Sequence, residues 1–427
     1  MATGPEKPFL WGAATSALQI EGQLENDITM WERAGMFRRD GFDPRVGQAV
    51  DHWRRWREDF ELIEKLGLNA YRFSVAWSRI EPWPGRFDES ALKQYREMLG
   101  VLLDKGITPM LTLHHFTHPT WFHERCPWHT SYAVDAFVRF VEVLADQLLD
   151  RVPLILTFNE PLVWVLGAYG DAKLPPGERN LQQMMAALKH MMIAHRRAYD
   201  LIKIRHPAAQ IGIAHNFMVF KRARPFSRID RQLQRMVHHF YNIMLPEAFV
   251  TDRLRFTFPL LMHYNEPIDL DNRIDFWGIN YYCRAHVRFR FDLRRPFEVL
   301  FLPQGGLGVS DLGWETYPKG LRYVCNWLEF TEKPLYITEN GMAAEDDTVR
   351  VEYLKSHLQQ LAEAQRQGHP VRGYFHWSLL DNYEWLVGEK ARFGLYHVDY
   401  ANDLKRTLKP SGEFYRSHIR NSLRQHR

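Results

Sequence analysis

The chain has 427 residues, a length that fits either two or three ordinary domains or one long α/β barrel. Hydrophobic residues make up 45% of it and charged residues 25%, the balance of an ordinary soluble globular protein. The net charge of +4 is small for this length, so composition gives no reason to expect a nucleic-acid partner.

Basic residues concentrate in two runs, 221–235 and 284–295, and neither has an RNA-binding motif beside it. The simpler interpretation of each run is a solvated loop or helix surface. Residues 1–8 are polar, lack the apolar core of a signal peptide and are expected to form a flexible tail. No uninterrupted apolar run approaches a bilayer-spanning length, so the sequence predicts a cytoplasmic protein with no membrane partner.

The three cysteines, Cys126, Cys283 and Cys325, lie far apart and form no CxxC motif. This pattern argues against a disulfide framework and against a structural zinc site. Histidines are also clustered between His114 and His129, which raises the alternative of a metal site. No carboxylate or cysteine lies near them at ligand spacing, so neither a metal nor a cofactor is predicted.

Eight short β-prone runs recur along the chain, each followed by a helical pattern. The runs span 9–16, 69–75, 107–115, 152–159, 210–215, 274–282, 334–339 and 371–378. The helical patterns span 57–66, 90–105, 131–149, 181–205, 230–248, 318–330, 351–367 and 410–425. Strict alternation of strands and helices indicates a parallel sheet, and eight units fit a closed (β/α)₈ TIM barrel. No linker interrupts the pattern, so residues 1–427 are predicted to form one α/β domain.

Two of these strands end on a glutamate in the same way. Glu339 follows the β-prone run 336–338, and Asn340 and Gly341 come next, which tolerate left-handed turn geometry. Glu160 follows the run 154–159, and Pro161 cannot continue a sheet ladder. An unpaired carboxylate is costly to bury in a core, whereas the carboxyl ends of barrel strands are where active sites lie.

Other polar and aromatic side chains fall at or just beyond the same strand ends. They are Gln19, Arg72, His115, Asn159, Asn280, Tyr282, Trp377, Glu384 and Trp385. Two carboxylates without a metal-ligand cluster indicate acid–base or nucleophilic chemistry, and glycoside hydrolysis requires such a pair. In its retaining form one carboxylate attacks the sugar, while the other protonates the leaving oxygen and later activates water. Arg72 would keep the nucleophile ionised, and the second glutamate would need a raised pKa.

Residues 9–22, 71–79, 157–161, 275–282, 336–341 and 373–385 together resemble glycoside hydrolase family 1, the β-glucosidase family. The combination of the motifs TFNEP and ITENG is highly specific, and the similarity runs from Phe9 to the last helix. The resemblance implies a retaining β-glycosidase on a (β/α)₈ barrel that acts on small β-glycosides without a cofactor. It implies that Glu160 is the acid/base and that Glu339 is the nucleophile.

The resemblance also implies roles for the surrounding residues. Tyr282 would hydrogen-bond the nucleophile, Trp377 would lie under the sugar, and Trp314 would lie on the aglycone side. The positions that would bind the sugar in the −1 subsite are Gln19, His115, Asn159, Glu384 and Trp385. Asn280 and Phe393 complete the expected substrate-binding set, although Phe393 could equally belong to the core. Arg72, Tyr282 and Asn159 are grouped with the catalytic pair.

Several positions depart from the family pattern, among them Phe116, Thr117 and the run 126–128. These changes suggest a more open entrance and leave the aglycone undetermined. Glucose is the expected sugar, with galactose and fucose as alternatives. A transglycosidase with the same glutamates, or a non-catalytic sugar-binding barrel, are the competing functions, and the presence of both glutamates argues against the latter. The sequence leaves the choice between monomer and homo-oligomer open.

Overall fold

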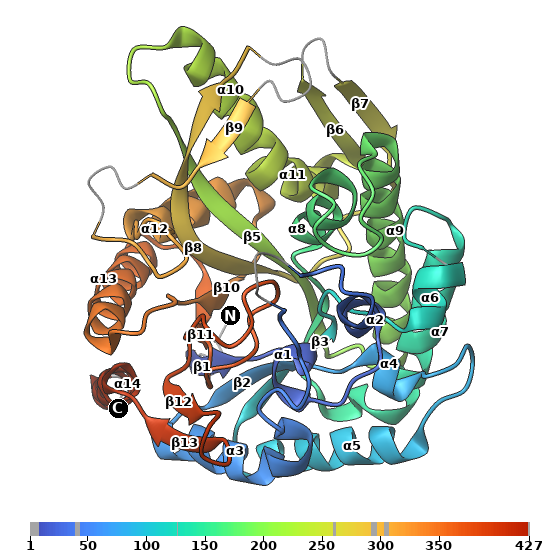
Figure 1. Ribbon diagram of the computed structural model, residues 1–427, viewed down its shortest axis with the longest axis vertical. Coiled ribbons are helices and arrows are strands. Elements are labelled where there is room, and N and C mark those ends of the chain that lie inside the picture. The colour runs from blue at the N-terminus through green and yellow to red at the C-terminus, as the bar shows by residue number, and fades with distance from the viewer. Residues whose placement is uncertain are drawn as a thin grey trace, which may run out of the picture.

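The protein is described by a computed structural model that covers residues 8–38, 43–125, 127–258, 262–291, 297–302 and 307–425. Apart from Pro8, the expected N-terminal tail lies outside the described residues, and so does Cys126. Eight parallel strands form the centre (Figure 1). They are β1 (Leu10–Ala14), β2 (Ala70–Ser74), β3 (Thr108–His114), β4 (Leu154–Asn159), β5 (Gln210–Arg222), β8 (Phe276–Phe289), β10 (Leu335–Asn340) and β11 (Val371–Trp377).

Each of these strands pairs with two neighbours, so the sheet closes on itself. The order is β1-β2-β3-β4-β5-β8-β10-β11, and β11 pairs with β1. The (β/α)₈ barrel predicted from the alternation is therefore confirmed. Closure satisfies both edges of every strand, which removes the unpaired backbone groups of an open sheet.

Helices surround the strands and lie at the predicted places (Figure 1). They are α3 (His52–Leu66), α5 (Glu89–Asp104), α7 (Tyr132–Gln147), α9 (Leu181–Arg205), α10 (Arg228–His238), α11 (Met244–Thr251), α12 (Lys319–Trp327), α13 (Asp347–Arg366) and α14 (Pro410–Gln425). Side-chain caps explain several starts, because Asp88, Asn180 and Asp346 each accept backbone N–H groups of the first turn. The single helix expected over 230–248 is instead two helices, separated by a π-helical turn, η3 (His239–Ile243).

The structure adds elements that the sequence pattern did not reveal. Strands β5 and β8 run well past the predicted ends, and β9 (Phe297–Leu300) pairs antiparallel to β8. Two hairpins join β6 (Arg253–Phe258) to β7 (Met262–Pro267) and β12 (Tyr396–Asp399) to β13 (Lys405–Leu408). Short helices occupy the loops: α1 (Ala17–Glu21), α2 (Asp27–Arg33), α4 (Trp77–Ile80), α6 (Thr120–Arg125), α8 (Pro161–Val165) and the turns η1 (Leu149–Arg151), η2 (Leu166–Gly170) and η4 (Glu329–Thr331). Gln19, expected in a loop, thus lies in α1.

The core has two main parts, and two small apolar clusters lie apart from them. The larger apolar cluster fills the space between the strands and the helices. A smaller cluster fills the barrel itself, where Met110, Leu156, Phe276 and Phe375 are completely buried. The inner cluster includes Trp377, at the end of β11, and so extends to the carboxyl ends of the strands.

Gly341, which follows the strand end at Glu339, is required for a reason other than the expected one. Neither Asn340 nor Gly341 has a positive φ, so no left-handed turn stops β10. Instead, a Cβ at Gly341 would overlap the backbone carbonyl of Trp377. The absence of a side chain allows the segment after β10 to pass directly against the end of β11.

We expect Gly341→Ala to lower the free energy of unfolding by about 1–3 kcal/mol, because backbone on both sides must move. Gly100→Ala is the matched control, since Gly100 lies within α5 and has no atom within 4 Å of an added Cβ. That substitution should stabilise the protein by up to about 1 kcal/mol. Urea denaturation of both variants measures the difference, and equal stability would contradict the packing argument.

Candidate active site

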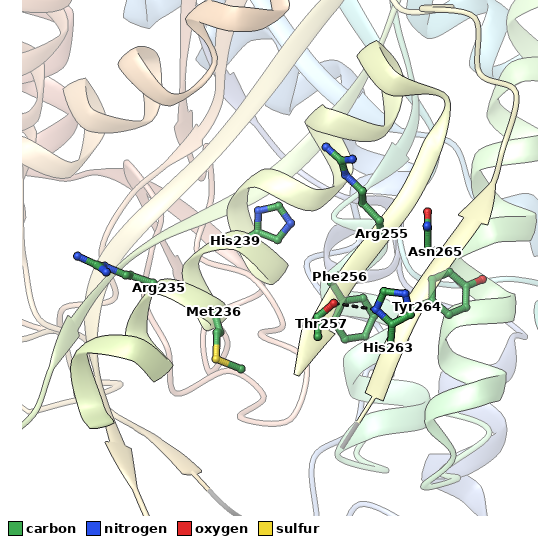
Figure 2. A pocket seen from close by; sticks show the side chains of 9 residues that line it. All are labelled: Arg235, Met236, His239, Arg255, Phe256, Thr257, His263, Tyr264 and Asn265. Atoms are coloured by element: carbon green, nitrogen blue, oxygen red, sulfur yellow. Dashed lines mark hydrogen bonds between the residues drawn. The ribbon is translucent and has the colours of Figure 1, made fainter. Parts of the chain in front are cut away.

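Three cavities are candidates for the site. One, of about 470 Å³, lies between α3 and the turn that joins β12 to β13, and although it contains carboxylates, none of its lining residues belongs to a barrel strand. The other two differ in their lining. The larger, of about 510 Å³, lies between η3 with the end of α10 and the β6–β7 hairpin (Figure 2), and none of its nine lining residues carries a carboxylate. The other, of about 370 Å³, lies at the carboxyl ends of the barrel strands and is lined by Glu160 and Glu339. Barrel enzymes work at this face, and the acid–base groups are here, so this cavity is the candidate active site.

The structure brings most of the predicted residues to this cavity. Its lining includes His115, Asn159, Glu160, Tyr282, Trp314, Glu339, Trp377, Glu384, Trp385 and Phe393. Three other predicted residues, Gln19, Arg72 and Asn280, are completely buried behind the lining. Their contacts hold the lining side chains in place.

Glu339 lies in β10 and is paired with a buried cation. Arg72 of β2 donates from Nη1 to Glu339 Oε1 at 2.6 Å, and Tyr282 donates its hydroxyl to Oε2. Burial raises the pKa of Glu339, whereas the charge of Arg72 and the two hydrogen bonds act to lower it. Both oxygens therefore have donors that favour the ionised carboxylate.

Glu160 has a different environment. Its Oε1 accepts from Asn216 and Asn280, both at 2.8 Å, and no cation forms an ion pair with it among the described residues. Burial raises the pKa of Glu160 to about 7, and the negative charge of Glu339 adds to that effect. The two amide donors oppose the shift only in part. Of the two carboxyls, Glu160 is therefore the one suited to carry a proton near neutral pH.

Asn280 links the two halves of the site. Its Nδ2 donates to Glu160 and, at 3.0 Å, to Asn159 Oδ1, while its Oδ1 accepts from Thr338 at 2.7 Å. Asn159 also accepts from Arg72 at 2.6 Å. A continuous set of hydrogen bonds thus runs from the cation beside Glu339 to the carboxyl of Glu160.

Backbone geometry at the cavity is unusual at three non-glycine residues. Phe116, Glu160 and Trp385 have φ values of 70°, 44° and 24°, in or near a region that costs ordinary residues energy. All three line the cavity. Strain at these places is consistent with side chains held in position for function rather than for stability.

Aromatic rings form two walls. On one side Trp377 and Trp385 each lie nearly parallel to His115, with ring centroids 6.1 Å away. On the other side Trp314 and Phe393 contact Tyr282 at 5.6 and 6.2 Å. Burial holds the pKa of His115 well below its usual value, so its neutral ring can accept from Asn159 Nδ2 at 3.2 Å. His115 thus serves as a polar neighbour in the site.

The remaining histidines of the cluster serve other purposes. His114 is buried among aromatic rings such as those of Trp128 and Phe158. His118 faces Asp27, with 3.5 Å between Nε2 and the carboxylate. Within the described ranges, no three His, Cys, Asp or Glu side chains are grouped so that they could hold a metal ion.

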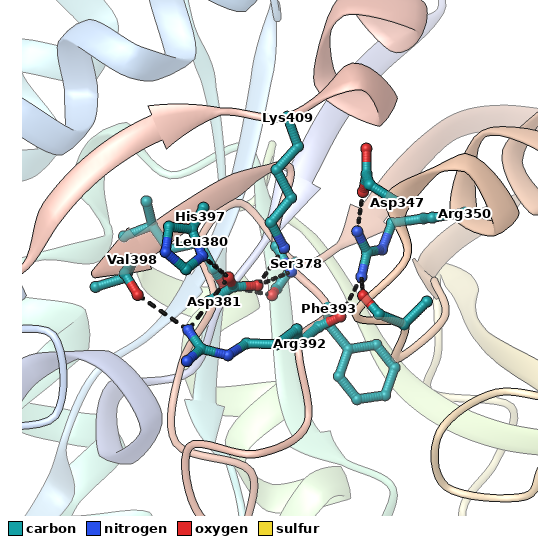
Figure 3. Close-up of polar contacts among 12 residues, drawn as sticks. Asp347, Arg350, Ser378, Leu380, Asp381, Arg392, Phe393, His397, Val398 and Lys409 are labelled. Carbon is teal, nitrogen blue, oxygen red and sulfur yellow. Dashed lines mark hydrogen bonds and ion pairs between the residues drawn. The ribbon is translucent and has the colours of Figure 1, made fainter. Parts of the chain in front are cut away.

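The loop after β11 carries Glu384 and Trp385, and a buried charge cluster supports it (Figure 3). Asp381 is completely buried and accepts from Lys409 Nζ at 2.6 Å and from the Gly394 amide at 2.9 Å. Arg392 and His397 lie at 3.5 and 3.3 Å from the same carboxylate. The cluster ties this loop to the segment that contains Phe393. Its members all lie between Asp381 and Lys409, and the sequence pattern did not reveal it.

Glu384 receives a hydrogen bond from Gln19 Nε2 at 3.1 Å, which connects the α1 loop to the loop after β11. Gln19 also donates to Asn382 at 3.2 Å and accepts from Ser16 at 2.6 Å. Burial, together with the charge of Glu339, raises the pKa of Glu384 to about 8. A neutral carboxyl can both donate and accept hydrogen bonds, as a sugar hydroxyl requires.

Sequence reasoning missed two site residues, Asn216 and Tyr241. Tyr241 in η3 donates to Asn216 Oδ1 at 2.8 Å, which orients the amide so that Nδ2 donates to Glu160. The predicted fifth strand ended at His215, one residue short of Asn216. The available signal was the same one that identified Asn159, a polar residue at the end of a β-prone run.

The fold and the site define a class of protein: a barrel enzyme with two buried carboxyls in contrasting environments, suited to acid–base or nucleophilic hydrolysis. Residues 3–423 match the family model of glycosyl hydrolase family 1. The chain therefore belongs to glycosyl hydrolase family 1 and is a glycoside hydrolase.

Individual relatives agree with this assignment. The chain is 34% identical to beta-glucosidase A of Thermotoga maritima, and the match covers 97% of each protein. A solved beta-glycosidase from Pyrococcus horikoshii has 37% identity and a TM-score of 0.89, with 97% of this chain and 94% of that chain covered. A solved beta-glucosidase from Thermotoga maritima in complex with glucoimidazole has 31% identity and a TM-score of 0.88, with 97% of this chain and 98% of that chain covered.

The raised pKa of Glu384 predicts a pH-dependent stability. Folded Glu384 holds its proton up to about pH 8, whereas the side chain of an unfolded glutamate, with its ordinary pKa of 4.5, loses the proton near that pH. Stability from this group is therefore present below pH 4.5 and is lost as pH rises toward 8. Glu384→Gln removes that loss, so we expect the variant to gain about 4 kcal/mol over wild type at pH 8 and less than about 1 kcal/mol at pH 5.

Thermal melts at the two pH values measure this gain. Glu345→Gln, at an exposed position, is the control and should show the same difference from wild type at both. A gain for Glu384→Gln that does not depend on pH would show that charge burial is not its cause.

Proposed function

We propose that this chain is a retaining β-glycosidase that releases glucose, and alternatively galactose or fucose, from the ends of small β-glycosides. Glu339 acts as the nucleophile and Glu160 as the acid/base. The observation that carries the proposal is the contrast between the two carboxyls. Glu339 is paired with Arg72, whereas the only side-chain donors to Glu160 among the described residues are amides, and the pKa of Glu160 is raised to about 7.

In the first step the Glu339 carboxylate attacks the anomeric carbon, and a covalent glycosyl–enzyme bond forms. Protonated Glu160 gives its proton to the glycosidic oxygen, so that the aglycone leaves as a neutral alcohol. Before attack, the Tyr282 hydroxyl and Arg72 orient and stabilise the ionised nucleophile. After proton transfer, Asn216 and Asn280 stabilise the new carboxylate of Glu160.

In the second step Glu160, now ionised, takes a proton from a water molecule that attacks the anomeric carbon. The bond to Glu339 breaks, and the sugar leaves with the configuration it had in the substrate. The pKa of Glu160 must lie near the working pH, because the same group gives a proton in one step and accepts it in the other.

The lining supports recognition of a single sugar ring. Trp377 offers an aromatic face, and His115, Asn159, Glu384 and Trp385 offer polar groups around it. The relative that is in complex with glucoimidazole supports a glucose-like ring at this place. Trp314 and Phe301 line the cavity as well, and we assign them to the aglycone side.

We further propose that the barrel and its loops act as one domain and that the enzyme works in the cytoplasm. Cys283 and Cys325 are buried and free, which is compatible with a reducing compartment. Among the described residues no helix has the length and apolar character needed to cross a bilayer. A transglycosidase would use the same glutamates, and the choice depends on whether water or a sugar acceptor attacks the intermediate.

We expect purified protein to hydrolyse nitrophenyl β-glucoside. Its relative rates of hydrolysis on a panel of nitrophenyl β-glycosides will show which sugar it prefers. Proton NMR of the first product should show the β-anomer, because two displacements restore the original configuration. The α-anomer as first product would overturn the retaining mechanism. Binding of the sugars without turnover would favour the non-catalytic barrel, and transfer to an added sugar acceptor in preference to water would favour the transglycosidase.

Glu339→Ala tests the assignment of the nucleophile. This variant should lose turnover of β-glucosides, and added azide should restore turnover and give an α-glycosyl azide as the product. A β-glycosyl azide would contradict the assignment of the nucleophile.

The alkaline limb of the profile of kcat/KM against pH should fall near pH 7, where Glu160 loses its proton. Asn216→Ala removes a donor that favours the ionised form, so the pKa of Glu160 rises and the limb moves to higher pH, by about one pH unit. Tyr241→Phe should move it in the same direction by less. Asn265→Ala, in the cavity without carboxylates, should leave the profile unchanged. A shift to lower pH for Asn216→Ala would refute the role of the amide.

A further inference from the structure

The basic run 221–235 and the described part of the second basic run, residues 284–291, come together in the fold. Strands β5 and β8 remain paired up to Arg222 and Val287, beyond the barrel. Arg224, in the turn that follows β5, donates to the Phe289 carbonyl at 3.3 Å, and Asp230 accepts from the Phe289 amide at 3.0 Å. In Figure 1 this end of the two strands lies beside α10 and β9, away from α3 and α5.

Apolar side chains project from the same place. Phe226 and Phe291 are 96% and 97% exposed, and no other large apolar side chain of the described residues is as exposed. Ile229, in the first turn of α10, is 54% exposed. Single exposed apolar residues are common on proteins, but here the extreme cases occur together on one projection. We call Phe226, Ile229 and Phe291, together with the cations Lys221, Arg228 and Arg231, the β5–β8 tip.

Three cations of the tip have no acidic partner among the described residues. Lys221, Arg228 and Arg231 are exposed and form no ion pair with any described residue. Arg228 and Arg231 are three residues apart on α10 and so lie on one side of the helix. The run 221–235 contains one lysine and five arginines against a single acid, Asp230, which is buried and paired with Arg224.

Exposed apolar side chains beside unpaired cations suit one class of partner, the surface of a lipid bilayer. Exposed aromatic and aliphatic side chains that alternate with cations are suited to the boundary between lipid headgroups and acyl chains. Cations near an anionic bilayer are attracted to its surface, and the aromatic rings can enter the interface. A nucleic acid would need ring faces along a groove, whereas side chains exposed to 96% and 97% line no groove, and Ile229 has no ring.

We propose that the β5–β8 tip docks the enzyme peripherally on an anionic lipid bilayer, with Phe226 and Phe291 inserted at the headgroup level. Docking of this kind needs no helix that crosses the membrane. The proposal therefore differs from the prediction, made from the sequence, that the protein has no membrane partner. It goes beyond the proposed glycosidase activity. The same strands carry Asn216, Asn280 and Tyr282, and Arg222 lies six positions beyond Asn216 along β5. The docked surface therefore lies about 20 Å from the acid/base along β5.

The test is flotation of the full chain with two kinds of vesicle, phosphatidylcholine alone and phosphatidylcholine mixed with phosphatidylglycerol. Wild type should bind only the anionic vesicles, and added salt should weaken the binding because it screens the attraction. Phe226→Ser with Phe291→Ser should reduce the partition about tenfold or more, since the inserted rings are lost. Arg228→Gln with Arg231→Gln should reduce it about fivefold for each arginine.

Ile204→Ser is the control, because Ile204 is 81% exposed on α9 and lies outside the tip. It should bind vesicles as wild type does. The Phe226/Phe291 variant should keep wild-type turnover of nitrophenyl β-glucoside, which shows that it is folded. Vesicle binding requires no turnover, so this test is independent of the proposed glycosidase mechanism.

Three outcomes would overturn the proposal: wild type that floats with neither vesicle, a Phe226/Phe291 variant that binds like wild type, or a single-stranded oligonucleotide that is bound through the same residues while vesicles are not. The last would assign the tip to nucleic acid.

Discussion

The ion pair between Arg72 and Glu339 is the interaction on which the rest of the site depends. Arg72 is completely buried, and a buried guanidinium is tolerated only when its donors have partners. Its partners are Glu339, the Thr338 carbonyl, Asn159 and Thr112, which belong to β10, β4 and β3. One cation inside the barrel therefore determines where the ends of four strands, its own β2 included, can lie relative to one another.

Hydrogen bonds and ring contacts lead outward from this ion pair in two directions. Through Asn159 and Asn280 the contacts reach Glu160, which has amide partners and forms no ion pair with any cation that the structure describes. Through Tyr282 the contacts reach the aromatic wall formed by Trp314 and Phe393. Burial raises the pKa of both glutamates. For Glu339 the charge of Arg72 opposes that rise, whereas for Glu160 the negative charge of Glu339 adds to it. The contrast between the two carboxyls thus depends in part on where one arginine lies.

The loops that complete the site depend on supports of their own. The loop of Glu384 and Trp385 is anchored by the buried carboxylate of Asp381, and the α1 loop is joined to it by Gln19. The same long strands that carry Asn216 and Tyr282 extend past the barrel to the β5–β8 tip. The candidate active site and the tip are therefore joined by the same pair of hydrogen-bonded strands.

The sequence by itself determined the barrel, the approximate bounds of its strands and helices, and the two glutamates. These are local properties, because alternation, periodicity and a glutamate at the end of an apolar run can be read within a few residues. Only the tertiary structure decided that Asn280 links Glu160 to Asn159, that Tyr241 orients Asn216, that Gly341 is needed for close approach to Trp377, and that residues 221–231 and 284–291 lie together. Each of these depends on strand register and on contacts between residues far apart in the chain, and no local pattern encodes such contacts.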